Sequence, residues 1–286
     1  MHQPVLLDKV IDCLNPKPGE NFVDCTIGQT GHAFAILKQI QPNGKVLGID
    51  ADSEAIKRIK SQEGLILAHG NFKDLKEIVQ KKSFKPINGI LFDLGLSSWQ
   101  IEESGRGFSF RRDEPLLMNY DNHELTAEIV INQWPEETLI EIFQKYGEEK
   151  YNRRIAKKII NERRVRPIKT TFQLLEIIKK AVPYSKTRRG QINRVAARIF
   201  QALRITVNNE LENLKQGLEQ AVEILEPEGR LIVISFHSLE DRIVKNFFRE
   251  NESLKILFKK PVMADEEEIK KNSRSRSAKL RVGIKI

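Results

Sequence analysis

The chain of 286 residues is 40% apolar and 30% charged, as expected for a globular protein that buries a substantial core. No run reaches the roughly 20 apolar residues that span a bilayer, and the first residues do not form a basic stretch followed by an apolar one, so we expect neither a membrane protein nor a secreted one. Cys13 and Cys25 are the only cysteines, which excludes a disulfide framework and a thiolate zinc site and favours a cytoplasmic protein.

The net charge of +9 is concentrated in one part of the chain. Residues 145–204 contain 18 lysines and arginines and four acidic residues, a net charge of +14, so the remainder carries −5. A surface that neutralises phosphates is expected to concentrate positive charge in this way. We therefore favour a polyanion-binding segment over the alternative, a set of solvated helix faces.

Short apolar runs alternate with helical patterns in the first third of the chain. The predicted strands are 21–25, 45–50, 65–70 and 89–95, and the helices between them are 31–40, 53–60 and 73–82. Four strands that alternate with helices predict right-handed βαβ units and therefore a parallel sheet covered on both faces.

The next clear strand begins only at Gly229, after an amphipathic helix. Because a single crossover helix cannot fill so long a gap, we expect an inserted, mainly helical domain that carries the basic excess. A helix, a strand around 254–263 and a closing strand at 278–286 complete the prediction. The expected division is 1–113 and 208–286 for the two parts of the sheet domain and 114–207 for the insert.

Polar residues stand where the predicted strands end, which is where ligands bind to sheets of this kind. Asp24 leads into a turn with Gly28 and Gly31 that would let the backbone approach a ligand, although any tight turn favours glycine. Asp50 is placed to accept hydrogen bonds from two ribose hydroxyls, or else to cap the next helix. Asp93 follows four apolar residues, which suits a site better than packing.

Together with Asn71 and Phe72 after the third strand, these residues match the architecture of S-adenosylmethionine-dependent methyltransferases. That class characteristically closes its sheet with an antiparallel strand, as the C-terminal hairpin predicts. The expected fold is thus α/β, a Rossmann-like class I methyltransferase sheet, mostly parallel with an antiparallel closing strand, and an inserted, mainly helical domain. A nicotinamide oxidoreductase would share the first two strand ends, but its G-x-G-x-x-G pattern is absent.

Nine segments, in chain order from His2 to Arg281, resemble signature blocks of the ribosomal RNA small subunit methyltransferase H family, also called MraW. They are HQPVLLDKVIDCL, DCTIGQTGH, HGNF, GILFDLGLSSWQ, RGFSFRRDEPL, YGEEKYNRRIAKKI, FQALRITVNNEL, ISFHSLEDRIVK and NSRSRSAKLR. The resemblance implies that S-adenosyl-L-methionine supplies a methyl group to the exocyclic N4 of a cytidine in the decoding region of 16S ribosomal RNA. It further implies 16S rRNA in the small ribosomal subunit as partner. From the sequence itself we expect no membrane partner and no metal, and it leaves open whether the protein is a monomer or a homodimer.

The resemblance also implies site residues. Its cofactor contacts fall on Thr30, Gly31, His32, Asp50, Phe72, Asp93 and Gln100. Within this set, Asp50 corresponds to the ribose acid and Phe72 to the aromatic side chain beside the adenine.

The chain departs from the family pattern at several positions. Gln29 and Thr30 stand where glycines are usual, so Thr30 must either avoid a positive φ or bear strain. Leu117 and Asn119 replace an acid and an arginine, and R-V-A-A-R replaces a histidine-proline stretch before FQALRI. These changes affect the expected substrate pocket more than the cofactor site. They motivate an alternative, a non-catalytic RNA-binding factor with a degenerate methyltransferase fold.

Methylation at N4 needs an oriented amine but no covalent intermediate, whereas methylation at C5 needs a cysteine nucleophile. We expect both cysteines to be buried and structural, which favours nitrogen. A DNA amino-methyltransferase typically has an Asp/Ser/Asn-Pro-Pro-aromatic motif after the fourth strand, where this chain reads DLGLSS. Because a base edge must be unstacked to react, a flipped or loop cytidine is expected.

Two residues are candidates for a catalytic role. Asp93 is expected to orient the target amine or the sulfonium, and His237 is the second candidate because it could face the site. Next to it, Ser238 and Asp241 have the spacing of a capping box. The histidines lack the spacing of metal ligands, so no metal is predicted.

Overall fold

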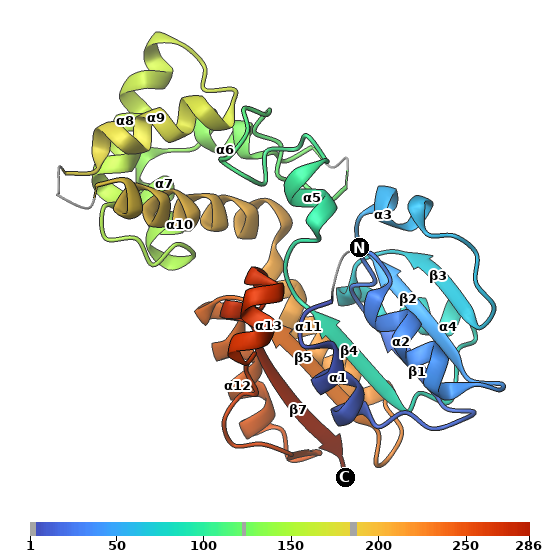
Figure 1. Cartoon of the computed structure of the whole chain (residues 1–286). Coiled ribbons are helices and arrows are strands. Elements are labelled where there is room, and N and C mark those ends of the chain that lie inside the picture. The colour runs from blue at the N-terminus through green and yellow to red at the C-terminus, as the bar shows by residue number, and fades with distance from the viewer. Residues whose placement is uncertain (1–3, 122–123, 184–187) are drawn as a thin grey trace. The chain divides into compact units, whose positions relative to one another are not determined.

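The computed structural model describes residues 4–121, 124–183 and 188–286 (Figure 1). His2 and His123, for which no ligand role is expected, and residues 184–187 of the basic segment lie outside the described residues. Two compact units make up the chain: unit 1 is Met1–Gly95 with Leu211–Ile286, and unit 2 is Leu96–Glu210. In the part of the chain that the structure describes, no helix combines the length and the apolar character needed to cross a membrane.

Unit 1 is built on a seven-stranded sheet with the order β3-β2-β1-β4-β5-β7-β6. Its strands are β1 (Asn21–Asp24), β2 (Lys45–Asp50), β3 (Leu65–His69), β4 (Gly89–Asp93), β5 (Arg230–Ser235), β6 (Leu254–Ile256) and β7 (Lys279–Lys285). The first five strands pair in parallel, and β7 runs antiparallel to both of its neighbours. The predicted fold class, a mostly parallel sheet with an antiparallel closing strand, is confirmed.

The strand expected around 254–263 is much shorter in the structure. It ends at Ile256, and Val262 returns to the sheet only as an isolated antiparallel bridge to Leu280. Pro261, which lies between them, has no N–H and cannot donate a ladder hydrogen bond, which explains why a continuous strand does not form.

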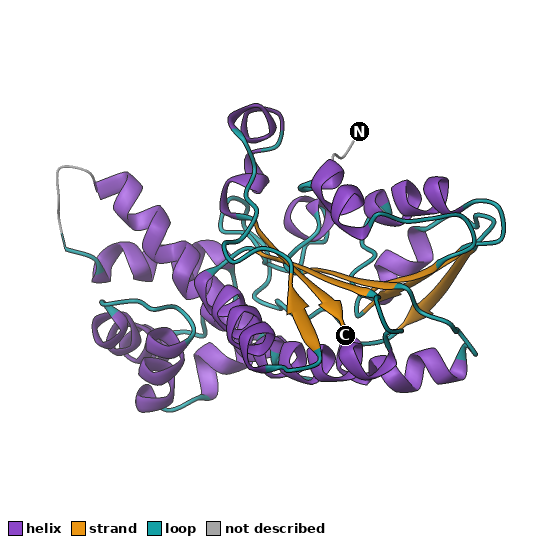
Figure 2. Cartoon of the chain, turned by 90° about the horizontal axis from the view of Figure 1, so that it is seen from below, coloured by secondary structure: helices purple, strands orange, loops and turns teal. Residues whose placement is uncertain are grey.

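Successive residues of each strand point to opposite faces of the sheet and build two separate cores. In β4, Ile90 and Phe92 join the core that Leu75 and Leu214 complete from the helices on that face. Leu91 joins the other core. Helices therefore cover both faces of the sheet, as Figure 2 shows.

The helical elements of unit 1 alternate with its strands. They are α1 (Leu7–Leu14), α2 (Gly31–Ile40), α3 (Ser53–Arg58), η1 (Phe72–Asp74), α4 (Leu75–Lys81), α11 (Glu210–Ile224), α12 (Ser238–Glu250), α13 (Glu266–Lys271) and η2 (Ser273–Ser277), where η is a 3-10 helix.

Unit 2 is mainly helical, as the sequence predicts for the insert. Its helices are α5 (Ser98–Glu102), α6 (Ala127–Gln133), α7 (Glu136–Lys145), α8 (Asn152–Val165), α9 (Thr171–Ala181) and α10 (Arg188–Asn208). Apolar side chains three and four residues apart, such as Ile155 and Ile159 of α8, bury one face of each long helix in a common core.

The units divide after Gly95 and after Glu210, whereas the sequence places the boundaries after residues 113 and 207. The segment between Gly95 and residue 113 packs on unit 2: the Phe108 ring stacks on Tyr120 with centroids 5.7 Å apart, and Phe110 meets Phe200 edge-on at 5.3 Å. The contact of Phe110 with Phe200 joins residues far apart in the chain, so no local change in composition marks the first boundary.

Candidate functional site

Three aspartates end three neighbouring parallel strands of unit 1. Asp24 ends β1, Asp50 ends β2 and Asp93 ends β4, and β1 lies between β2 and β4 in the sheet. Because the carboxyl ends of parallel strands share one edge, the side chains that the sequence singled out come together there.

The loop after β1 ties these strand ends together by hydrogen bonds. The Thr26 N–H donates to Asp24 Oδ1 at 3.1 Å, and the Thr26 hydroxyl oxygen accepts from the Asp93 N–H at 2.8 Å. Two residues further on, the Gly28 N–H donates to Asp50 Oδ2 at 2.9 Å. Thr26 was not among the predicted site residues, and nothing in the sequence singles out one hydroxyl in a polar loop.

Asp50 uses both carboxylate oxygens on the backbone of the adjoining loops. Its Oδ2 accepts from Gly28, and its Oδ1 accepts from the Asp52 N–H at 2.9 Å. Helix α3 is capped by Asp52, whose side chain accepts from the Glu54 N–H. The alternative role of Asp50 as a helix cap is therefore wrong. Burial raises the pKa of Asp50 to about 6 although these N–H groups favour its charged form.

Thr30 and Gly31 begin helix α2 under tight constraints. Thr30 has φ 66°, a left-handed conformation that is strained for a β-branched residue, and its hydroxyl donates to the Gln29 carbonyl at 2.6 Å instead of capping the helix. A Cβ added at Gly31 would overlap Cγ of Pro4. Gly31 thus lets the start of the chain pack against α2.

His32 lies in the same helix and reaches Asp93. Its Nε2 is 2.9 Å from the Val5 carbonyl oxygen, which can only accept, so Nε2 carries a hydrogen. Its Nδ1 lies 3.5 Å from Asp93 Oδ2. Burial lowers the pKa of His32 and thus favours the neutral ring, whose Nδ1 lone pair then faces a carboxyl oxygen. The contact between His32 Nδ1 and Asp93 Oδ2 is favourable only when a proton lies between these two atoms.

Asp93 is poised between its two protonation states. Burial, and secondarily the charge of Glu240, raise the pKa of Asp93 to about 7. Among the described residues, nothing donates a hydrogen bond to its buried Oδ1. Burial likewise raises the pKa of Asp24 to about 7, while His32 and the Thr26 N–H act in the opposite direction. A buried acceptor without a donor is costly, so this oxygen suits a ligand that brings an N–H or O–H.

Phe72 follows β3 in η1, and its ring meets Phe92 edge-on with centroids 5.4 Å apart. A Cβ at Gly217 would lie 2.9 Å from the Phe72 ring, so α11 also packs closely on it. Phe72 has a packing role that the sequence did not reveal, and its cofactor contact stays a prediction.

Gln100 belongs to unit 2, where it completes a capping box at the start of α5. Its side chain accepts from the Ser97 N–H at 2.9 Å, and the Ser97 hydroxyl accepts from the Gln100 N–H. Gln100 is buried in this arrangement, and its cofactor contact stays a prediction too.

His237 is the N-cap of α12, where Nδ1 faces the Glu240 N–H and the Glu240 side chain accepts from the His237 N–H. The capping box expected for Ser238 and Asp241 is therefore wrong by one residue. Asp241 instead pairs with Arg281 at 2.7 Å and with Lys279 at 3.1 Å. The H-x-x-E spacing of His237 and Glu240 is the sequence feature that could have predicted this capping box.

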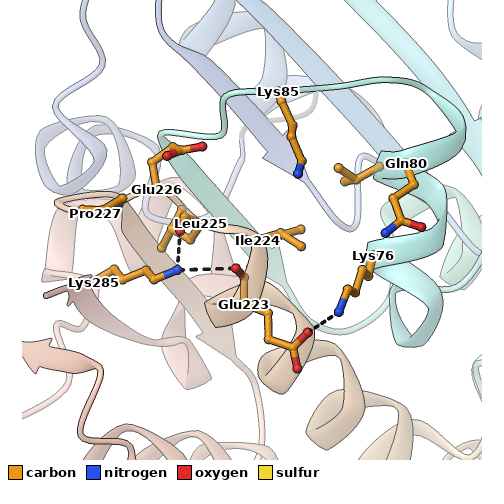
Figure 3. Close-up of a pocket in the computed structure, with 10 residues that line it drawn as sticks. Lys76, Gln80, Lys85, Glu223, Ile224, Leu225, Glu226, Pro227 and Lys285 are labelled. Atoms are coloured by element: carbon orange, nitrogen blue, oxygen red, sulfur yellow. Dashed lines mark hydrogen bonds and ion pairs between the residues drawn. The ribbon is translucent and has the colours of Figure 1, made fainter.

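A pocket of about 430 Å³ lies elsewhere on unit 1 (Figure 3). Its lining includes Lys85 before β4 and Lys285 at the end of β7, so it lies at the sheet edge opposite the aspartates. The Lys285 ammonium donates to the Leu225 carbonyl at 2.6 Å, and Lys76 pairs with Glu223 at 2.7 Å. These bonds hold the end of α11, so we do not assign the active site here.

The whole chain, residues 1–286, matches the MraW methylase family. The chain belongs to this family. It is 45% identical over 308 aligned positions to the ribosomal RNA small subunit methyltransferase H of Halothermothrix orenii, covering 100% of this chain and 98% of the relative. The protein of that name from Clostridium botulinum strain Loch Maree is 44% identical, with 100% and 99% covered. Among solved structures, a Streptococcus mutans protein in complex with SAH is similar, with a TM-score of 0.46, 12% identity and 100% of both chains covered.

The cofactor of this MraW family member is S-adenosyl-L-methionine, the methyl donor of methylases built on such a sheet. The residues at the sheet edge fit it chemically. The cofactor carries a cationic sulfonium and an ammonium group, and the edge offers three carboxyl groups, one of them with an unpaired oxygen.

The departures from the family pattern have visible consequences in the structure. Thr30 adopts the positive φ that a glycine would adopt without strain. Asn119 is buried in unit 2, and its carbonyl accepts from the Arg106 guanidinium at 3.2 Å. Helix α10 runs unbroken through R-V-A-A-R, where Val195 and Ala196 are buried.

Proposed function

We propose that this protein transfers the methyl group of S-adenosyl-L-methionine to the exocyclic N4 of a cytidine in the decoding region of 16S ribosomal RNA. The full-length family match and the relatives' name support an rRNA substrate. The observation that carries the assignment of nitrogen is the buried Oδ1 of Asp93, an acceptor that no described residue satisfies.

Asp93 orients the nucleophile. The N4 lone pair of cytidine is delocalised into the ring, so the amine has to be held with its lone pair toward the methyl group. Asp93 Oδ1 accepts one amine N–H and thereby fixes that direction. When the new N–C bond forms, N4 carries one hydrogen too many. Asp93 Oδ1 takes that proton, and the proton between Asp93 Oδ2 and His32 Nδ1 moves onto the histidine, so the carboxyl never carries two protons.

His32 assists from the other side of the same carboxyl. His32 Nδ1 lies 3.5 Å from Asp93 Oδ2, and the hydrogen bond from Nε2 to the Val5 carbonyl fixes the orientation of the ring. Asp93 therefore presents Oδ1 in a constant direction. His237, the other catalytic candidate, acts in this proposal through Glu240, which it helps to position and whose charge raises the pKa of Asp93.

The cysteines do not support carbon methylation. Cys25 is 1% exposed, and burial raises the pKa of its thiol, as it does for Cys13. A thiol that resists ionisation is a poor nucleophile for attack on a pyrimidine ring.

The proposed cofactor contacts are those of the family resemblance: Thr30, Gly31, His32, Asp50, Phe72, Asp93 and Gln100. Asp50 has lone pairs left for two ribose hydroxyls after accepting from Gly28 and Asp52. The positive segment of unit 2 is the proposed contact with RNA.

The test is methyl transfer from labelled S-adenosyl-L-methionine to small ribosomal subunits from cells without the endogenous activity, followed by nucleoside mass spectrometry. We expect N4-methylcytidine from the wild type, a rate at least 100-fold lower from Asp93→Asn, and wild-type rates from Asp12→Asn, whose side chain is exposed on α1. Cofactor binding without transfer would indicate another substrate. Loss of both cofactor binding and transfer in the wild type would favour the non-catalytic RNA-binding factor.

A further inference from the structure

Five of the seven exposed side chains of helix α8 are cations. At 100° per residue, its exposed side chains fall within an arc of about 140° on one side of the helix. They are Arg153, Arg154, Lys157, Lys158, Asn161, Arg164 and Val165. The opposite side buries Ile155, Ala156, Ile159 and Ile160 in the core of unit 2. We refer to Arg153, Arg154, Lys157, Lys158 and Arg164 as the α8 cation row.

The α8 cation row has no acidic partner in the described parts of the chain. Other helices of this protein neutralise surface lysines with an acid three or four residues earlier in the same helix. Such pairs are Glu54–Lys57, Glu77–Lys81, Glu176–Lys179, Glu212–Lys215 and Glu267–Lys271. The one acid within α8, Glu162, pairs with Lys180 of α9. The α8 cation row is therefore an exception to the surface pattern of its own chain.

The positions of these charges also make helix α8 less stable. Arg153 and Arg154 occupy the first turn, where the positive end of the helix dipole favours acids, and α8 has no acid there. Arg153 and Lys157, like Arg154 and Lys158, are four residues apart and repel each other. Because these charges do not stabilise the helix, they are better explained by the binding of an anionic ligand.

We propose that the α8 cation row binds the phosphate backbone of the RNA substrate. Arg153 and Arg164 are eleven residues apart, so the row is about 16 Å long, which suits a polyanion better than a single phosphate. Three of its five members are arginines, whose planar guanidinium binds phosphate oxygens in pairs. This proposal rests on the proposed function, because the methylation of ribosomal RNA is what identifies the polyanion as RNA.

The double variant Arg153→Glu with Arg154→Glu separates binding from folding. It puts acids in the first turn and four residues before Lys157 and Lys158, so thermal stability should be unchanged or higher. Affinity for a 16S rRNA fragment at 150 mM salt should fall at least tenfold, and the slope of log K against log salt should become shallower by about 1.4. The matched control, Lys81→Glu with Lys215→Glu, makes the same change of charge on lysines that have acidic partners and lie outside residues 145–204, and should stay within twofold of the wild type.

The assay is filter binding over a range of salt, with calorimetric titration of S-adenosyl-L-methionine on the same proteins. Unchanged cofactor affinity shows that unit 1 is intact. RNA binding by the α8 variant at wild-type strength overturns the proposal, as does an equal loss in the control. A variant that loses binding only to vesicles of phosphatidylglycerol also overturns it, in favour of a membrane. A wild type that binds the fragment through α8 but methylates no subunit would refute the proposed function and leave the RNA surface standing.

Discussion

Replacing Asp24 by Asn tests the electrostatic argument on which the site rests. Asp24 is 2% exposed, and burial raises its pKa to about 7 from an ordinary 3.8. The folded protein therefore keeps this proton over a range where the unfolded chain has lost it. Stability that is fully present below pH 4 is lost as pH rises towards 7, and above pH 7 the loss is complete.

The size of the effect follows from the shift. At about 1.4 kcal/mol per pKa unit, a carboxyl raised from 3.8 to about 7 makes unit 1 less stable at pH 8 by at most about 4 kcal/mol. Asn is neutral at every pH and keeps the oxygen that accepts from the Thr26 N–H. Asp24→Asn should therefore match the wild type near pH 4 and exceed it by about 2 to 4 kcal/mol at pH 8.

Amide hydrogen exchange measured by mass spectrometry reports this difference for the strands of unit 1. We compare the protection of β1 and β4 at pH 5 and pH 8, corrected for intrinsic exchange, with Asp12→Asn as the exposed control. Fluorescence of Trp99 and Trp134, which both belong to unit 2, monitors the other unit. Parallel pH profiles for the wild type and Asp24→Asn would refute the reasoning, because they would mean that Asp24 is ionised in the folded state without cost.

Three further results are expected. Asp50→Asn should weaken cofactor binding at least tenfold in calorimetry, because Gly28 and Asp52 donate to different carboxylate oxygens and the NH2 group that replaces one of them cannot accept. Unchanged affinity would show that the loops hold without that bond. Thr30→Gly relieves about 1 to 2 kcal/mol of left-handed strain and adds about 0.5 to 1 kcal/mol of chain entropy, so the melting temperature should rise by about 1 to 3 °C, and a fall would indicate that the Thr30 side chain contributes packing. The ratio of S-adenosylmethionine to S-adenosylhomocysteine affinity should grow from pH 6 to pH 8 as the buried carboxyls of Asp24 and Asp93 ionise, because only S-adenosylmethionine carries a positive sulfonium. A ratio independent of pH would contradict the proposed role of charge.

The sequence was sufficient for the features that depend on local pattern. Apolar runs that end in Asp24, Asp50 and Asp93 predicted both the parallel strands and the shared edge, because chain order and the βαβ rule leave few arrangements. The prediction of a mainly helical insert likewise agrees with α8, whose buried residues recur every three or four positions.

Features that depend on contacts between distant residues could not be predicted. The approach of His32 Nδ1 to Asp93 Oδ2 depends on where α2 packs relative to the end of β4, and the link from Thr26 to Asp93 depends on the register of two strands. Gln100 was singled out for a cofactor contact without its role in a capping box, since a polar residue three positions after a serine suits either role.

Unit 1 has a cluster of buried carboxyls and unit 2 has the α8 cation row. The presence of both clusters favours an enzyme over a simple RNA-binding factor. A protein that only held RNA would need the cations of α8 but would gain nothing from buried carboxyls, which make unit 1 less stable at neutral pH. Asp93 and Asp50 each raise the pKa of Asp24 further, so the edge is under electrostatic strain without a cation. A cationic methyl donor relieves that strain, just as phosphates would relieve the repulsion along α8. If a sulfonium binds at the carboxyls and a phosphate backbone binds along α8, as we propose, then the two charge clusters together serve the methylation of a nucleic acid.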